Sequence, residues 1–197
     1  MSTENEDEDE EHIIRVVMLG ALAVGKTALI LKFVNNKFPL EHDGTIEDTY
    51  FVDINIEEKK RKLKIIDTSG HSDFQNNLDT WISQGDCFLL IYSINDFNSF
   101  EQVKTIYKKI CQIKEEEENI IAILIGNKCD LPLIERKVLT NEAEEYAKNN
   151  NMNFLESSAF NGYNVKEAFC GITKKYLEIN RDDSENKGGR SLCYYCF

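Results

Sequence analysis

Residues 20–27 have the sequence GALAVGKT, which combines the residue types that hold phosphate groups. Glycine, four residues and then Gly-Lys-Ser/Thr is the phosphate-binding loop pattern, in which glycine lets backbone N–H groups turn toward an anion. In that pattern Lys26 reaches the terminal phosphates and the hydroxyl group of Thr27 binds Mg²⁺. The alternative is a chance glycine-rich turn. The pattern alone indicates a nucleotide but not its base.

The flanking segments favour the phosphate-loop interpretation. Residues 13–19 form an apolar run typical of a buried strand, and residues 27–36 have the pattern of a helix. The N-terminus of that helix would add the positive end of its dipole to the anion site. The expected nucleotide contacts in this region are Gly20, Leu22, Ala23, Val24, Gly25, Lys26, Thr27 and Ala28.

A second motif indicates which base is bound. The apolar run 120–126 ends in the sequence GNKCD at residues 126–130. An ionised carboxylate accepts two parallel hydrogen bonds, and guanine offers such a pair of donors whereas adenine does not. Asp130 is therefore the expected guanine reader, with Asn127 and the aliphatic stem of Lys128 holding the base and the loops. The alternative, an ordinary polar turn, loses weight because the motif follows a phosphate loop.

Two further segments suit the metal ion and the last phosphate. The sequence DTSG at residues 67–70 follows a strand-like run, so Asp67 would hold Mg²⁺ through a water and the Gly70 N–H would meet the γ-phosphate. Thr45 would offer its hydroxyl group to Mg²⁺ and its N–H to the same phosphate. The predicted metal ligands are Thr27, Thr45 and Asp67. A loop fixed only by such contacts relaxes once the γ-phosphate leaves.

The elements that position these motifs alternate along the chain. Apolar runs predict strands at 13–19, 49–57, 62–67, 86–92, 120–126 and 153–155. Helical patterns cover 27–36, 74–83, 97–114, 140–150 and 164–179, the fourth with Thr140 as its N-cap. A hairpin is expected near 58–60, because no helix separates the second and third strands. We predict an α/β fold of the P-loop NTPase type, with a six-stranded, mostly parallel sheet and helices on both faces.

Together these motifs resemble those of a small GTPase of the Ras superfamily, and within it the Ras family proper, over residues 13–179. The resemblance implies a switch between GDP and GTP that binds effector proteins through residues 42–50 and meets exchange factors and activators. It also implies that the motif at 156–159 forms the last nucleotide loop, with Ser158 and Ala159 near the base. Phe38 would cover the base. Phe160 stands where the family usually has lysine.

Three residues depart from the Ras pattern. Leu22 replaces a glycine that faces the γ-phosphate, His71 replaces the glutamine that orients water, and Gly44 replaces a proline before Thr45. The expected catalytic residues are Lys26, Thr45, Gly70 and His71, and we expect GTP hydrolysis to be slow. Three alternatives stay open: a pocket readjusted around Leu22 with ordinary hydrolysis, a GTP-loaded binding module with negligible hydrolysis, and an ATP-using enzyme, against which Asp130 argues.

Charge and length bound the organisation of the chain. The net charge is −12 over 197 residues, which argues against nucleic acid as a partner. Residues 1–11 hold seven acidic residues and no basic one, so we expect a disordered acidic arm, with a partner-binding or regulatory role as the alternative. A GTP-binding domain is expected at 12–180 and a flexible tail at 181–197.

The cysteines separate into two groups. Four are expected to be reduced, buried or half-buried side chains: Cys87, Cys111, Cys129 and Cys170. Cys193 and Cys196 lie in the tail, but neither is fourth from the end, where prenylation requires it. Palmitoylation, an unusual prenylation, a zinc or disulfide role and no anchor all stay open. We expect a cytoplasmic protein, at the inner face of a membrane if a cysteine carries lipid.

Overall fold

The computed structural model describes residues 12–39, 47–70, 77–115 and 120–185. Six strands form one sheet in the order β2-β3-β1-β4-β5-β6, and every neighbouring pair is parallel except β2 with β3. The strands are β1 (Ile13–Leu19), β2 (Glu47–Ile56), β3 (Lys59–Thr68), β4 (Cys87–Ser93), β5 (Ala122–Asn127) and β6 (Asn153–Ser157). The predicted α/β sheet with one antiparallel edge is confirmed.

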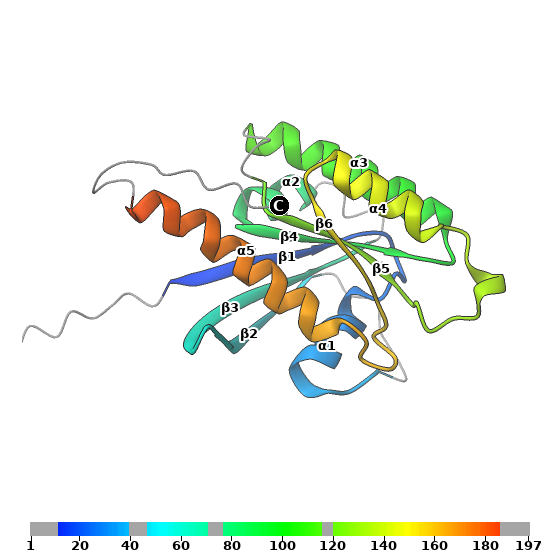
Figure 1. The fold of residues 1–197 in the computed structure, drawn as a ribbon, viewed down its shortest axis with the longest axis horizontal. Helices are drawn as coiled ribbons and strands as arrows, with labels where there is room; N and C mark the ends of the chain where they lie inside the picture. The colour runs from blue at the N-terminus through cyan, green and yellow to red at the C-terminus, as the bar shows by residue number, and fades with distance from the viewer. Residues whose placement is uncertain (1–11, 40–46, 71–76, 116–119, 186–197) are drawn as a thin grey trace, which may run out of the picture.

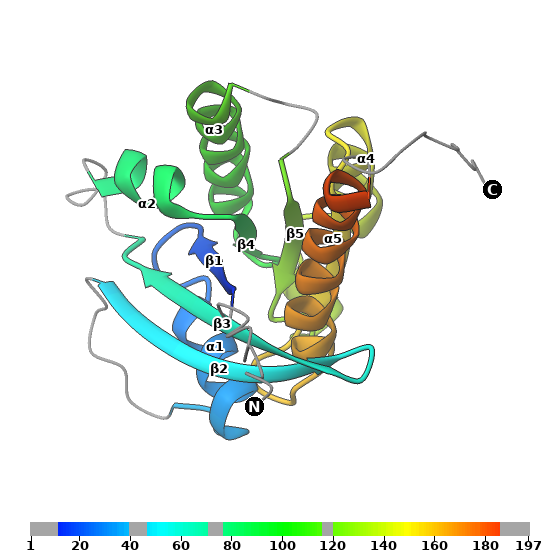
Figure 2. The ribbon, with the colours of Figure 1, turned by 90° about the vertical axis from the view of Figure 1, so that its left-hand side faces the viewer.

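Helices cover both faces of this sheet (Figure 1; Figure 2). They are α1 (Lys26–Asn35), α2 (Leu78–Gln84), α3 (Phe97–Lys114), α4 (Thr140–Asn149) and α5 (Val165–Glu185). Helices α1 and α5 share one buried cluster with the sheet, while α2, α3 and α4 share the other. Strands β4 and β5 are buried along their whole length, as expected for the centre of a parallel sheet covered on both sides.

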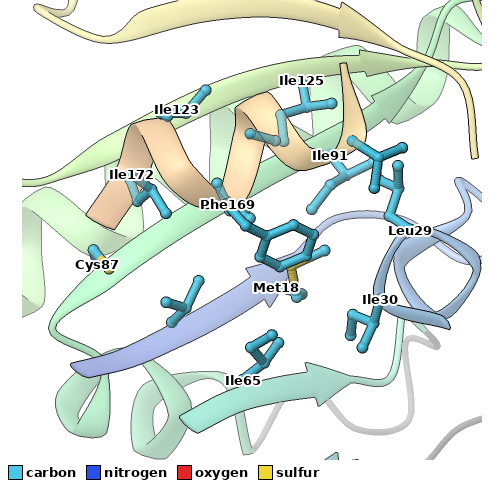
Figure 3. Close-up of a cluster of buried hydrophobic side chains, with 14 of the residues drawn as sticks. Met18, Leu29, Ile30, Ile65, Cys87, Ile91, Ile123, Ile125, Phe169 and Ile172 are labelled. Atoms are coloured by element: carbon cyan, nitrogen blue, oxygen red, sulfur yellow. The ribbon is translucent and has the colours of Figure 1, made fainter. Parts of the chain in front are cut away.

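Close packing between α5 and the sheet defines the first cluster. Phe169 points from α5 onto Met18 of β1, and Ile172, one turn further along α5, belongs to the same cluster (Figure 3). The ring of Phe169 also stacks on Phe33 of α1, with the centroids 4.2 Å apart. This cluster fixes α1 behind the phosphate-binding loop.

The predicted hairpin is present, with its turn slightly before the expected residues 58–60. Glu57 and Glu58 form its turn with φ angles of 51° and 63°, the left-handed conformation that a two-residue hairpin turn requires. Helix α2 begins at Leu78 and ends at Gln84. Residues 74–76 of the predicted helix 74–83 lie outside the described residues. Helix α5 continues to Glu185, beyond the predicted end at 179.

The predicted N-cap of α4 is wrong. Leu139 occupies the cap position, and Thr140 is already inside the helix. The hydroxyl group of Thr140 instead donates to Oε1 of Glu156 at 2.9 Å. The Thr140 hydroxyl group therefore binds a carboxylate of β6 and does not cap the helix.

The four cysteines of the first group are free thiols, with Cys87 buried and Cys111, Cys129 and Cys170 half-buried, as expected. Burial raises the pKa of the Cys87 thiol, so that side chain stays neutral. Cys193 and Cys196 lie outside the described residues.

Candidate nucleotide-binding site

The phosphate-binding loop runs from the end of β1 to the start of α1, and its two outer glycines are sterically required. Gly20 has a φ of 153°, and a Cβ there would lie 2.0 Å from the carbonyl oxygen of Ile91. Gly25 has a φ of 99°, and a Cβ there would lie 2.4 Å from Nδ2 of Asn127. Ala23 between them adopts a φ of 60°, a conformation that costs alanine about 1–2 kcal/mol.

Lys26 lies buried at the centre of this loop. Its Nζ donates to the carbonyl oxygens of Gly20 and Ala21, both at 2.9 Å. Burial lowers the pKa of Lys26 to about 8, and the carboxylate of Asp67 opposes that shift. A phosphate group would supply the negative charge that favours the protonated amine.

Thr27 and Asp67 meet beside Lys26. The hydroxyl group of Thr27 donates to Oδ2 of Asp67 at 2.5 Å, and the carboxylate is fully buried. One hydroxyl oxygen and one carboxylate fit Mg²⁺, which takes few protein oxygens and completes its shell with water and substrate phosphates. The third predicted ligand, Thr45, lies outside the described residues.

Gly70 lies directly against the phosphate-binding loop. A Cβ at this position would be 2.3 Å from the carbonyl carbon of Ala21 and 2.4 Å from the backbone nitrogen of Leu22. Only glycine fits this contact. The backbone of Gly70 thus packs on the phosphate-binding loop, while His71, the next residue, lies outside the part of the chain that the structure describes.

Asn127 connects the base motif to the phosphate-binding loop. Its buried side chain donates through Nδ2 to the carbonyl oxygen of Val24 at 2.8 Å. Its Oδ1 accepts from Ser157 Oγ at 3.2 Å and from the backbone N–H of Ala159 at 3.3 Å. One amide thereby links three loops at the carboxyl ends of β1, β5 and β6.

Lys128 and Asp130, close to Asn127 in the chain, also bond to neighbouring loops. Lys128, at a φ of 69°, donates through Nζ to the carbonyl oxygen of Ala23 at 2.8 Å. Asp130 accepts a hydrogen bond from the hydroxyl group of Ser158 at 2.5 Å through Oδ1. The Asp130 side chain is therefore oriented from the last nucleotide loop.

These residues surround one cavity of about 640 Å³. At its rim the rings of Phe38 and Phe160 meet edge to face, with centroids 5.5 Å apart and an interplanar angle of 83°. Both rings are largely exposed, at 41% and 65%. A pair of apolar rings at the end of the cavity that holds Asp130 suits the flat face of a base.

The cavity includes most of the predicted contacts and adds others. Gly20, Val24, Asp67 and Ser158 are not among its lining residues and act on the site through the contacts given above. Sequence reasoning missed four lining residues, Pro39, Thr68, Ser69 and Leu131, although each is next to a predicted one.

Arg136 was also missed. Its guanidinium group binds the carboxylate of Glu156 through two hydrogen bonds of 2.6 and 2.9 Å. This pair ties the segment after β5 to the start of the last nucleotide loop, and it raises the pKa of Arg136. Nothing in the spacing of the two residues signals the contact.

Comparison with known proteins identifies the family. The model of the Ras family matches residues 15–178. The chain belongs to the Ras family. It is 38% identical over 170 residues to Ras-like protein rasC of Dictyostelium discoideum, covering 86% of this chain and 89% of that protein. It is 35% identical to Ras-like protein rasB of the same organism over 179 residues, covering 89% and 90% of the two chains.

A fungal relative gives the same result. Ras-like protein 2 of Mucor circinelloides f. lusitanicus is 35% identical over 171 residues, 87% of this chain and 84% of that protein. This Ras-family chain is accordingly a small GTP-binding switch protein with GTPase activity. Membership of the family also implies regulator and effector proteins as partners. Within the residues that the structure describes, no helix combines the length and apolarity needed to cross a membrane.

Proposed function

We propose that this Ras-family protein binds GTP with Mg²⁺ in the 640 Å³ cavity and hydrolyses it slowly, so that it spends much of its time GTP-bound. The observation that carries the proposal is the position of Leu22. Its side chain is 58% exposed and lines the cavity, and its backbone nitrogen packs against Gly70. We therefore expect the branched side chain to take space beside the γ-phosphate, close to Gly70.

Binding would use the contacts already described. Lys26 and the loop N–H groups would neutralise phosphate charge, and Asp130 would read the guanine edge, with Phe38 and Phe160 against the base. Thr27, Thr45 and Asp67 would hold Mg²⁺, which supplies charge neutralisation at the phosphates when bound. Ala159 would meet the base through its N–H.

Slow hydrolysis follows from what the reaction needs. The chemistry requires a water in line with the γ-phosphate and a group that orients it. Leucine at position 22 takes space that glycine leaves open, and a histidine ring at 71 differs in shape and donor geometry from a primary amide. In Ras, intrinsic hydrolysis on the order of 10⁻⁴ s⁻¹ rises about 10⁵-fold with an activator, equivalent to about 7 kcal/mol of barrier. Leu22 and His71 would both raise this activation barrier.

Single-turnover hydrolysis of preloaded GTP tests the proposal. We expect the Leu22→Gly, His71→Gln double variant to hydrolyse GTP at least about tenfold faster than the wild type, about 1.4 kcal/mol of barrier. Leu133→Gly is the matched control, because Leu133 is 84% exposed and does not line the cavity, and it should leave the rate unchanged. A wild-type rate equal to that of ordinary Ras proteins would contradict slow turnover. A rate below detection in all variants would favour the binding module.

The effector surface and the membrane contact are further parts of the proposal. Of the expected effector segment 42–50, the described residues begin at Glu47 and form the start of edge strand β2, with Glu47, Asp48 and Thr49 exposed. An exposed edge strand presents unpaired backbone groups to a partner. Lipid attachment at Cys193 or Cys196, and residence at the inner face of a membrane, stay predictions.

A further inference from the structure

One end of the sheet carries a basic face. The registers of β1, β2 and β3 place alternate side chains on the side of the sheet that α2 and α3 cover further along. Beyond those helices this side presents Ile13, Arg15, Phe51, Asp53, Lys60, Lys62 and Lys64, which together form the basic face.

Charge and exposure distinguish the basic face from the rest of the molecule. Among the described residues, this face carries the four basic side chains Arg15, Lys60, Lys62 and Lys64, with Asp53 at 2.9 Å from Lys60 and Asp86 bound to Arg15, although the whole chain carries a net charge of −12. Phe51 is 62% exposed and Ile13 is 39% exposed. An exposed aromatic ring among lysines marks a surface suited to an acidic partner.

The N-terminal arm joins the fold at the end of the sheet beside this face. Strand β1 begins at Ile13, whose Cα pairs with that of Lys62 in β3. Residues 1–11, with their seven acidic residues, come immediately before. His12 fixes where the arm begins, because its ring hydrogen-bonds the hydroxyl group of Tyr176 on α5 at 2.6 Å, on the opposite face of the sheet, so the arm starts at the edge between the two faces. The start of β1 and the β2–β3 turn lie at the same end of the molecule (Figure 1).

We propose that residues 1–11 of this chain dock on the basic face, with their carboxylates against Lys60, Lys62 and Lys64 and the chain across Phe51. Eleven residues reach roughly 36 Å when extended, more than the few residues of β3 that they need to follow. The covalent link gives the arm a high effective concentration at this surface, so many weak ion pairs act together.

A negatively charged membrane is the competing occupant of such a face. The arm is favoured because it is attached beside Lys62 and because its own seven acidic residues repel anionic lipid. Docking has a consequence that rests on the proposed function: Phe51 directly follows the expected effector segment, so a docked arm restricts access to edge strand β2.

Nuclear magnetic resonance on the full ¹⁵N-labelled chain tests the docking. In about 10 mM salt, where charges act over about 30 Å, we expect the amides of residues 4–11 to show the positive heteronuclear NOE values of an ordered segment. In about 1 M salt, and in the Lys62→Gln, Lys64→Gln variant, those values should fall to the low or negative values of a free chain. Lys148→Gln, Lys166→Gln is the matched control, because both lysines are exposed on other elements, and it should behave as the wild type.

Two results would overturn the proposal. The first is an arm that is equally mobile in the wild type and the Lys62→Gln, Lys64→Gln variant at low salt. The second is binding of phosphatidylserine vesicles by the wild type that depends on Lys62 and Lys64 while the arm stays mobile, since the face would then be a lipid contact. Nucleotide exchange and hydrolysis are read separately, so failure of the docking leaves the proposed function untouched.

Discussion

Lys26 is a buried amine whose charged form is unfavourable without a negatively charged ligand beside it. Its Nζ contacts the carbonyl oxygens of Gly20 and Ala21, and burial lowers its pKa from 10.5 to about 8. Carbonyl dipoles only partly replace the water that a charged amine loses. Burying the charged amine therefore lowers the stability of the protein, and the negative charge of a bound phosphate would offset this loss.

A pH dependence follows for the nucleotide-free and metal-free protein. Between pH 8 and 10.5 the folded Lys26 amine is largely neutral while the unfolded one still binds its proton, so the free energy of unfolding should rise with pH across this window. Lys26→Met is the control that removes the titration. Urea unfolding at several pH values, compared between the two proteins, measures the effect. A difference between them that does not change with pH would contradict it.

Asp130 is the second residue whose role is testable. Ser158 donates to Oδ1 of its carboxylate at 2.5 Å, and Asp130 lines the cavity. Asp130→Asn keeps the size but replaces an acceptor with a donor, so we expect GDP affinity to fall roughly 10- to 100-fold. Competition against labelled GDP measures it. Glu135→Gln, an exposed carboxylate nearby that does not line the cavity, should bind as the wild type does.

At the scale of elements, one hydrogen bond joins strand β2 to helix α2. The indole N–H of Trp81 donates to Oε2 of Glu47 at 2.6 Å, and the ring is 3% exposed. Glu47 belongs to the expected effector segment, and α2 follows the segment after Gly70. The strand that begins in the expected effector segment and the helix that follows the Gly70 segment are therefore coupled by a side-chain contact.

Trp81 is the only tryptophan of the chain, so it reports on this contact. We expect Glu47→Ala to shift the fluorescence emission of Trp81 and to lower the Tm by about 2–4 °C, because the buried indole N–H loses its acceptor at a cost of about 1 kcal/mol. Asp48→Ala is the control, since that side chain lies next along the strand and is also exposed. Equal spectra for the wild type and Glu47→Ala would show that the bond is unimportant in solution.

At the scale of the whole molecule, two buried clusters support one nucleotide site. The cluster under α1 and α5 includes Met18, Ile30 and Phe169, and the other cluster lies under α2, α3 and α4. The central strands belong to both clusters through alternate side chains. Loops at the carboxyl ends of β1, β3, β5 and β6 are positioned by this shared sheet.

Phe169→Ala probes that arrangement. The ring is 1% exposed and stacks on Phe33, so its removal should lower the free energy of unfolding by about 3–5 kcal/mol. Unfolding should stay a single transition, because both clusters share the sheet. Phe97→Ala, at 43% exposure, should change stability by no more than about 0.5 kcal/mol. Chemical denaturation followed by circular dichroism measures both, and two separate transitions would contradict the shared core.

The sequence by itself determined the α/β order, most strand positions and the family. Each of these depends on local information: apolar runs for the strands, and short motifs for the phosphate-binding loop and the base loop. Residues 13–19 and 97–114 were predicted with the bounds that the structure has. Local patterns suffice there because burial on both sides of a parallel sheet leaves little choice of residue type.

Only the tertiary structure decided which distant side chains meet. The bond from Asn127 to Val24 spans 103 residues and depends on the order of the strands in the sheet. Thr140 failed as an N-cap because Glu156 of β6 lies beside it, and Arg136 found the same carboxylate. The left-handed Ala23 and the paired rings of Phe38 and Phe160 have no sequence signal either. Such contacts depend on packing between elements, which a local pattern does not encode.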